Sequence, residues 1–245
     1  MTHFIAIAPV LLVFSLVQSL FGMGLLVFGT PTLLLMGYTF SQSLAYLLPV
    51  SITISSLQVL KNRNIDRKFA RNFIIYCIPF ICLCLTVYLY TKIRIRLEFF
   101  IASILLFNVL LRCLPTLEKR MQKFVQRNQK IFLVITGCVH GLSNMGGGLI
   151  SVFASSQYTT KEHILNCVSF CQLFFSIAPT VILLIFEPQL FSPEIIWFCL
   201  AAGGIYITVG TSLFSSSSQN VYRNLFTGFM VIYAGLLTVR GIGLI

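Results

Sequence analysis

The sequence predicts an all-α, polytopic membrane protein of about eight transmembrane helices, arranged as two repeated four-helix halves. Three observations predict this class. Hydrophobic residues make up 57% of the chain and charged residues only 9%, whereas a soluble domain usually carries roughly 25% charged residues. The apolar stretches are long enough for membrane spans, each of which needs about 20 residues. A short motif near the N-terminus also recurs in the second half of the chain.

The first half, residues 1–114, is predicted to hold four spans. The opening span begins near His3 and runs into a glycine-bearing stretch at residues 22–31, and a short apolar piece follows to Gly37. This stretch could alternatively form a re-entrant hairpin or an extra crossing, which would change the orientation of the spans that follow it. The other three predicted spans are residues 44–60, 73–90 and 97–114.

The second half, residues 131–245, follows a basic cytoplasmic connector at residues 115–130. Its opening span, residues 131–155, contains three consecutive glycines, and a polar connector at residues 157–162 comes next. The later predicted spans are residues 164–186, 195–214 and 225–245, with a turn at 187–194 and a serine-rich loop at 215–218.

The formal net charge of +11 comes largely from two connectors. Short basic connectors between apolar spans follow the positive-inside bias, so the charge does not indicate nucleic-acid binding. Placing both connectors in the cytoplasm predicts that both termini lie there too, and leaves Lys92, Arg94 and Arg96 on the opposite side. The connector cations are Lys61, Arg63, Arg67, Lys68 and Arg71 in the first and Lys119, Arg120, Lys123, Arg127 and Lys130 in the second.

The sequence indicates no cofactor, no metal site and no enzymatic activity. The eight cysteines fall in or beside apolar segments, and none has the C-x-x-C spacing of a zinc or redox site. A membrane enzyme would need a constellation such as H-E-x-x-H or paired carboxylates, and neither is present in the sequence. The first apolar run lacks a basic n-region and a cleavage site, so we interpret it as a retained span.

An internal repeat is the most informative feature. Residues 17–24 (VQSLFGMG) and 139–146 (VHGLSNMG) share four of eight residues at an offset of 122. Glycine costs a helix about 1 kcal/mol relative to alanine, and proline removes a backbone donor, so we predict an interrupted opening helix in each half. Unpaired backbone cannot face lipid, and paired interruptions point to a transport site. The alternative is that the glycines only permit close helix packing.

Polar side chains inside the spans are few. No acidic residue lies plainly at mid-membrane, so the carboxylate relay typical of many proton-coupled pumps is missing. His140 occupies the repeat position of Gln18, and it could donate to a substrate, make a structural hydrogen bond or carry a proton. Gln58 and Gln172 share an S-x-x-Q context in the second span of each half. They could make interhelical bonds or bind an oxyanion.

The two glycine stretches (Gly22-Met-Gly24 with Pro31, and Asn144-Met-Gly-Gly-Gly148) and the basic connector between two four-span halves resemble the TauE/SafE family. The resemblance implies a small multi-pass permease of the bacterial inner membrane that moves sulfite, sulfonates or related organic acids. The first copy departs from the family because it has Gly-Met-Gly-Leu-Leu where members often have a fuller glycine run.

The sequence therefore predicts alternating access at an anion site between two broken helices. Its expected partners are a small anionic substrate and the lipid bilayer, with a homo-oligomer as a further possibility; a passive anion channel and a structural subunit without transport are the alternatives. The predicted substrate-binding residues are Gln18, Gly22, Gly24, Pro31, Gln58, His140, Ser143, Asn144, Gly146, Gly147, Gly148 and Gln172.

Overall fold

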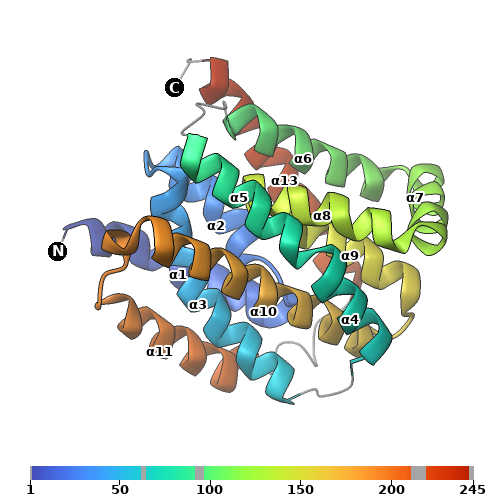
Figure 1. Cartoon of the computed structure of the whole chain (residues 1–245), viewed down its shortest axis with the longest axis horizontal. Coiled ribbons are helices and arrows are strands. Elements are labelled where there is room, and N and C mark those ends of the chain that lie inside the picture. Colours follow the sequence, from blue (N-terminus) through green and yellow to red (C-terminus); the bar gives the residue numbers. More distant parts are fainter. Residues whose placement is uncertain (1, 62–64, 92–96, 211–218, 243–245) are drawn as a thin grey trace.

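The computed structural model describes residues 2–61, 65–91, 97–210 and 219–242 (Figure 1). No strand occurs in these residues, which confirms the all-α class. The predicted loop at residues 215–218 and the cations Arg63, Lys92, Arg94 and Arg96 lie outside them. The helices are α1 (Thr2–Phe21), α2 (Leu25–Leu35), α3 (Phe40–Lys61), α4 (Arg67–Tyr76), α5 (Ile78–Thr91), α6 (Leu97–Cys113), α7 (Pro115–Arg127), α8 (Gln129–Ser143), α9 (Gly146–Gln157), α10 (Lys161–Phe186), α11 (Ile195–Ile205) and α13 (Gln219–Ile242), with a 3-10 turn η1 (Pro188–Leu190) and a π-helical segment η2 (Tyr206–Gly210).

Three helical stretches are long and apolar enough to cross a membrane by themselves: Phe40–Lys61, Arg67–Thr91 and Glu162–Phe186. A fourth results if α6 and α7 are counted as one bent span, although their axes differ by 103°. Shorter apolar helices are found at Ala6–Phe21, Leu25–Leu35, Ile195–Gly210 and Met230–Ile242. The structure thus supports a multi-pass membrane protein, while the number of eight spans stays a prediction.

The predicted opening span does not cross in one piece, because the chain turns back between α1 and α2. The rings of Phe14 in α1 and Phe28 in α2 lie 5.9 Å apart, whereas a continuous helix, rising about 1.5 Å per residue, would separate them by about 21 Å. The two helices pack along each other. The sequence left open a re-entrant hairpin within residues 22–37, whereas the structure makes Leu25–Leu35 a single helix that turns back along α1.

The second opening span is folded in the same way. Phe132 in α8 and Phe153 in α9 stack with ring centroids 6.3 Å apart, where an uninterrupted helix would place them about 30 Å apart. We call α1 with α2 the first hairpin and α8 with α9 the second hairpin. The turn of each hairpin lies inside the molecule, and we call these turns the two tips.

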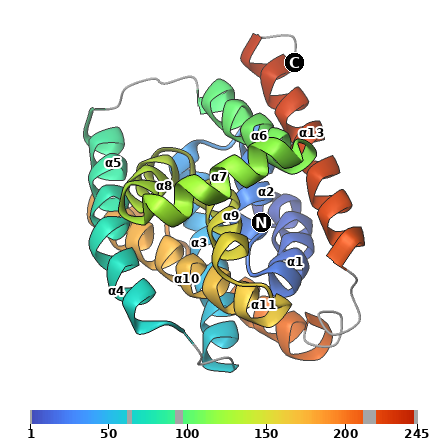
Figure 2. The same ribbon diagram turned by 90° about the vertical axis from the view of Figure 1, so that its right-hand side faces the viewer.

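The hairpins open toward opposite ends of the molecule. Phe69 of α4 stacks on Phe153 of α9 at 4.8 Å, and Gln126 of α7 donates to the carbonyl of Ser156. The second hairpin therefore opens beside both large basic connectors, at an end that we call the basic end. Figure 2 shows α7 lying across it.

The first hairpin opens at the other end. Arg240, in the last turn of α13, donates to the carbonyl of Leu35 at the end of α2, and Phe40 at the start of α3 contacts Tyr88 in the penultimate turn of α5. α3 begins at this end and finishes at Lys61, in the first basic connector. The C-terminal end of α13 is therefore separated from the basic end by the length of α3, about 33 Å for its 22 residues. The prediction that the C-terminus shares a side with the basic connectors is wrong, because a hairpin replaces the first crossing.

Two further boundaries differ from the sequence prediction. The span predicted at 73–90 begins at Arg67, and the helix breaks at Cys77 because Pro79 cannot donate a backbone hydrogen bond. The connector at 115–130 contains α7, a helix that hydropathy misses because it is amphipathic. It buries Val125 and leaves its cations exposed.

Candidate functional site

The first tip is a sharp turn that only glycine can make easily. Gly22 has φ +71° and Gly24 has φ +155°, and residues with a side chain disfavour such positive φ values. The amide of Gly22 closes α1 by donating to the carbonyl of Gln18 at 2.8 Å. A Cβ at Gly24 would lie 2.6 Å from Val17, so the start of α2 is pressed against the end of α1.

The second tip makes the same turn with a different residue. Asn144 has φ +62°, and its amide donates to the carbonyl of His140 at 2.7 Å. Asn144 lies at the repeat position of Gly22. Asparagine tolerates this left-handed conformation better than other non-glycine residues. The glycine run was predicted to interrupt the helix, but it forms the first turn of α9, which begins at Gly146.

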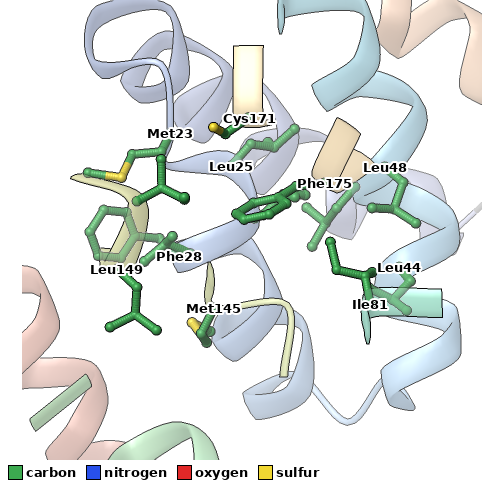
Figure 3. Close-up of a cluster of buried hydrophobic side chains, with 14 of the residues drawn as sticks. Met23, Leu25, Phe28, Leu44, Leu48, Ile81, Met145, Leu149, Cys171 and Phe175 are labelled. Carbon is green, nitrogen blue, oxygen red and sulfur yellow. The ribbon is translucent and has the colours of Figure 1, made fainter. Parts of the chain in front are cut away.

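The two tips touch each other. A Cβ at Gly147 would lie 3.4 Å from the Cβ of Met23 and 3.1 Å from a methyl group of Val27. The side-chain amide of Asn144 donates to Thr30 in α2 at 2.9 Å. Figure 3 shows Met23 and Met145, one from each tip, among the buried side chains between the hairpins.

Both tips also pack on α10. A Cβ at Gly22 would lie 2.8 Å from the hydroxyl of Ser169, and one at Gly147 would lie 3.4 Å from Oε1 of Gln172. Phe175, one turn further along α10, stacks on His140 with centroids 4.0 Å apart. The hairpin turns and one face of α10 therefore form a single buried junction.

Gln18 and Gln58 tie α1 to α3. Nε2 of Gln18 lies 3.0 Å from the hydroxyl of Ser51 and 2.9 Å from that of Ser55. Nε2 of Gln58 donates to the carbonyls of Gln18 and Ser19, at 3.1 and 3.2 Å. The carbonyl of Gln18 also accepts from the amide of Gly22. The carbonyl of Ser19 lies in the last turn of α1, where carbonyls lack donors within the helix, so Gln58 supplies a side-chain cap for α1.

His140 is fully hydrogen-bonded in its neutral form. Nε2 lies 2.9 Å from the carbonyl of Phe175, which assigns the proton to this nitrogen because a carbonyl can only accept. Nδ1 accepts from the backbone amide of Gly146 at 3.3 Å. The ring thus joins α8, the start of α9 and α10.

Several polar atoms at the junction have no partner. The buried atoms without a hydrogen bond are Oε1 of Gln18, Oε1 of Gln58, Oδ1 of Asn144, Nε2 of Gln172, Oδ1 of Asn166 and the hydroxyls of Ser15 and Ser169. An unpartnered buried polar group costs about 1–3 kcal/mol, so these atoms are the polar groups of the junction that are open to a water or a ligand. No buried polar residue in the described chain is Asp, Glu, Lys or Arg.

A comparison with protein families identifies the chain. The sequence profile described as "Sulfite exporter TauE/SafE" matches residues 7–237. The chain belongs to the TauE/SafE family. Since the match spans both hairpins and α10, this protein is a multi-pass membrane transporter of that family. No curated protein and no solved structure matches the chain significantly.

The structure brings most predicted site residues of this TauE/SafE protein together, but not all. Pro31 lies inside α2 rather than at the break, and Ser143 bonds within the second tip, to the carbonyl of Val139 and the amide of Met145. Gln58 and Gln172 do not occupy equivalent places, because Gln58 caps α1 and Gln172 faces Gly147.

Sequence reasoning missed several buried polar residues at or near the junction, among them Thr30, Asn108 and Asn166. Asn108 is buried in α6, and a Cβ at Gly148 would lie 2.6 Å from its Oδ1. Asn108 is the one amide side chain in the apolar sequence of α6. A lone amide in an apolar span is the signal that could have identified it.

Proposed function

We propose that this TauE/SafE protein exports small anions, such as sulfite, sulfonates or related organic acids, by alternating access at the junction of the two hairpin tips. One observation carries the proposal: the tips of two hairpins that open toward opposite ends meet at Met23 and Gly147, against the polar face of α10. A site at such a meeting point can be exposed to either side when one hairpin moves.

The tips supply neutral donors for an anion. α2 and α9 both begin at the junction, and the first amides of a helix have no acceptor within it. The aligned peptide dipoles add a partial positive charge of about half an electron at each of these N-termini. Gly147 and Gly148 place no side chain of their own over the start of α9, so polar side chains approach its backbone closely, Gln172 at Gly147 and Asn108 at Gly148. Nε2 of Gln172 is a further donor without a partner.

The absence of buried carboxylates from the described residues fits export of an anion. With an inside-negative potential, each exported negative charge releases about 2.3 kcal/mol per 100 mV. Efflux therefore needs no coupled proton or sodium ion. We assign His140, Gln18 and Gln58 to holding the tips in place, because their donor nitrogens are already bonded to protein.

The helix contacts support the proposed two-half arrangement. In this arrangement α1 corresponds to α8, α3 to α10, α5 to α11 and α6 to α13. The contact of α5 with α8 then matches that of α11 with α1, and the contact of α5 with α10 matches that of α11 with α3. The largest contacts join corresponding helices, α3 with α10 and α6 with α13. Thr39 and Thr160 cap the starts of α3 and α10 with the same side-chain bond to the third following amide.

The positive-inside bias orients the protein in a bacterial inner membrane. The exposed cations of the described residues gather at the basic end, so this end faces the cytoplasm. The second hairpin then opens to the cytoplasm and the first to the opposite side. The described cations at the basic end are Lys61, Arg67, Lys68, Arg71, Lys119, Arg120, Lys123, Arg127 and Lys130.

The test is sulfite efflux from proteoliposomes containing the Gly147→Ala variant. A methyl group there would approach Val27 to 3.1 Å and cover the amides of α9, so efflux should fall at least tenfold in a protein that remains folded. Gly204→Ala on α11 is the control, because a Cβ there meets nothing within 4 Å. Equal efflux in both variants and wild type would contradict a site at the tips.

Turnover separates a carrier from the alternative of a passive channel. Val27 and Met23 pack against Gly147 at the junction and leave little space there, as expected of a carrier that must rearrange for each anion. Efflux from single liposomes should then be slow and should saturate with internal sulfite. A linear current with no saturation would favour the channel.

A further inference from the structure

A cavity of about 230 Å³ lies at the basic end, beside the second hairpin. Its walls come from the start of α4, the end of α9 and the start of α10. The lining residues are Ile65, Asp66, Phe69, Tyr158, His163 and Cys167. We call it the basic-end cavity. Nothing in the proposed anion site uses these residues.

The chemistry of the cavity wall suits a hydrated anion passing through it. Partial burial raises the pKa of Tyr158 to about 12, so its hydroxyl stays protonated and can donate. The carboxylate of Asp66 accepts from the amide of Lys68 at 2.8 Å as the N-cap of α4, where the helix dipole offsets its charge. The exposed cations Arg67, Lys68 and Arg71 on the next turn attract anions to this face.

α10 carries a row of buried polar atoms that leads inward from this cavity. Asn166 Oδ1, Ser169 Oγ and Gln172 Nε2 follow at intervals of three residues, all lack a hydrogen-bond partner, and their residues are at most 8% exposed. Three residues turn a helix by about 300°, so each step shifts the side chain by about 60° and raises it about 4.5 Å. The row winds around α10.

The row begins next to a residue of the cavity wall and ends at the tips. Asn166 immediately precedes Cys167 of the cavity wall, Ser169 faces Gly22 at the first tip, and Gln172 faces Gly147 at the second tip. From Asn166 to Gln172 the distance along the helix is about 9 Å. Apolar contacts alone would fill this space at lower cost, since each unpartnered polar atom is unfavourable.

We propose that the basic-end cavity is the cytoplasmic mouth of the anion pathway, and that Ser169, with Asn166 holding hydration water, binds the hydrated anion between this mouth and the tips. The inference rests on the proposed function and extends it to a route and two residues along it. The ligand class is a small hydrated oxyanion: the Ser169 hydroxyl donates to it directly, whereas Oδ1 of Asn166 accepts from a water of its hydration shell.

The first test pairs two serines of α10. Ser169→Ala removes a hydroxyl without a partner, so the variant should be at least as stable as wild type, while sulfite efflux from proteoliposomes should fall about tenfold, the effect of one hydrogen bond to a charged ligand. Ser176→Ala removes a bonded hydroxyl, 2.7 Å from Ser51, and should lower the unfolding temperature. Ser103→Ala, an exposed hydroxyl on α6, is the control for efflux.

The second test uses Cys167 as a reporter. In a variant that keeps only this cysteine, a membrane-impermeant anionic methanethiosulfonate should modify it from the basic-end side, and methanesulfonate, which does not react with the reagent, should slow the modification at least threefold. A variant that keeps only Cys199, on α11 outside the route, is the control and should show no protection.

The outcomes separate the two proposals. Unchanged efflux in Ser169→Ala and in Asn166→Ala, with Gly147→Ala still inactive, would overturn the route and leave the tip site standing. Failure of methanesulfonate to protect Cys167 would likewise overturn the mouth. If Gly147→Ala transports normally, the tip site falls whatever the α10 variants do.

Discussion

Gly22→Ala tests the packing of the first tip on α10. The residue has φ +71°, and a Cβ there would lie 2.8 Å from the hydroxyl of Ser169, 3.0 Å from Leu165 and 3.2 Å from Val168. The substitution therefore imposes both backbone strain and overpacking. Gly37→Ala is the matched control, because Gly37 has φ +95° but a Cβ there meets nothing within 4 Å.

The magnitudes follow from the two contributions. An alanine in the left-handed region costs about 1–2 kcal/mol, and overpacking a close contact adds about 1–3 kcal/mol. Gly22→Ala should thus lose about 2–5 kcal/mol and Gly37→Ala about 1–2 kcal/mol. At about 2–4 °C per kcal/mol for a chain of this size, the unfolding temperature falls by about 4–20 °C and 2–8 °C respectively.

The assay is thermal unfolding of the detergent-purified protein, followed with a dye that fluoresces on reaction with thiols. The buried cysteines Cys77 and Cys171 become reactive only when the helices separate. The difference between the two variants measures the contact between the first tip and α10. If Gly22→Ala unfolds no earlier than Gly37→Ala, the tip is not packed on α10 and the reasoning is refuted.

Three other predictions test separate features. Asn144→Gly loses the bond to Thr30 but relieves the backbone strain, so its stability should be nearly unchanged. Asn144→Ala loses the same bond and keeps the strain, so it should cost about 2 kcal/mol by chemical unfolding; equal stability of the two variants would contradict the left-handed turn. Gln58→Leu removes the side-chain donor to the carbonyls of Gln18 and Ser19 and should lower the unfolding temperature of the protein, more than the control Gln42→Leu, whose bond to Thr39 is exposed. Alkaline phosphatase fused after the C-terminal residue should be active in cells, because Arg240 lies at the end opposite the basic end; a fluorescent, cytoplasmic C-terminal fusion would reverse the orientation.

The sequence was sufficient for the class and for the position of the tips, but not for their geometry. Composition predicts membrane helices because lipid excludes charge, and the repeat places both turns to within two residues. Hydropathy, however, reports how apolar a segment is and not its direction. An apolar stretch that crosses once and one that turns back have the same profile, so the hairpins could not be predicted with certainty.

Counting glycines also misplaced the second break. The left-handed turn needs one residue that tolerates positive φ, and at Asn144 this residue is not glycine. The three glycines that follow serve close approach instead: Cβ atoms at Gly146 and Gly148 would lie 2.7 Å from His140 and 2.6 Å from Asn108. Which of the two purposes a glycine serves depends on φ and on neighbours far away in sequence.

The hairpins change the number of membrane crossings in each half from even to odd, and this number determines how the two halves are related by symmetry. Four full crossings per half would return the chain to its starting side, so the two halves would be parallel and both tips would face the same way. A hairpin adds no crossing. In the proposed arrangement, α3, the α4–α5 pair and α6 then make three crossings, and the second half begins at the opposite end as an inverted copy. Inverted copies place their half-helix N-termini against each other at mid-membrane, which is where a transported anion needs donors from both sides.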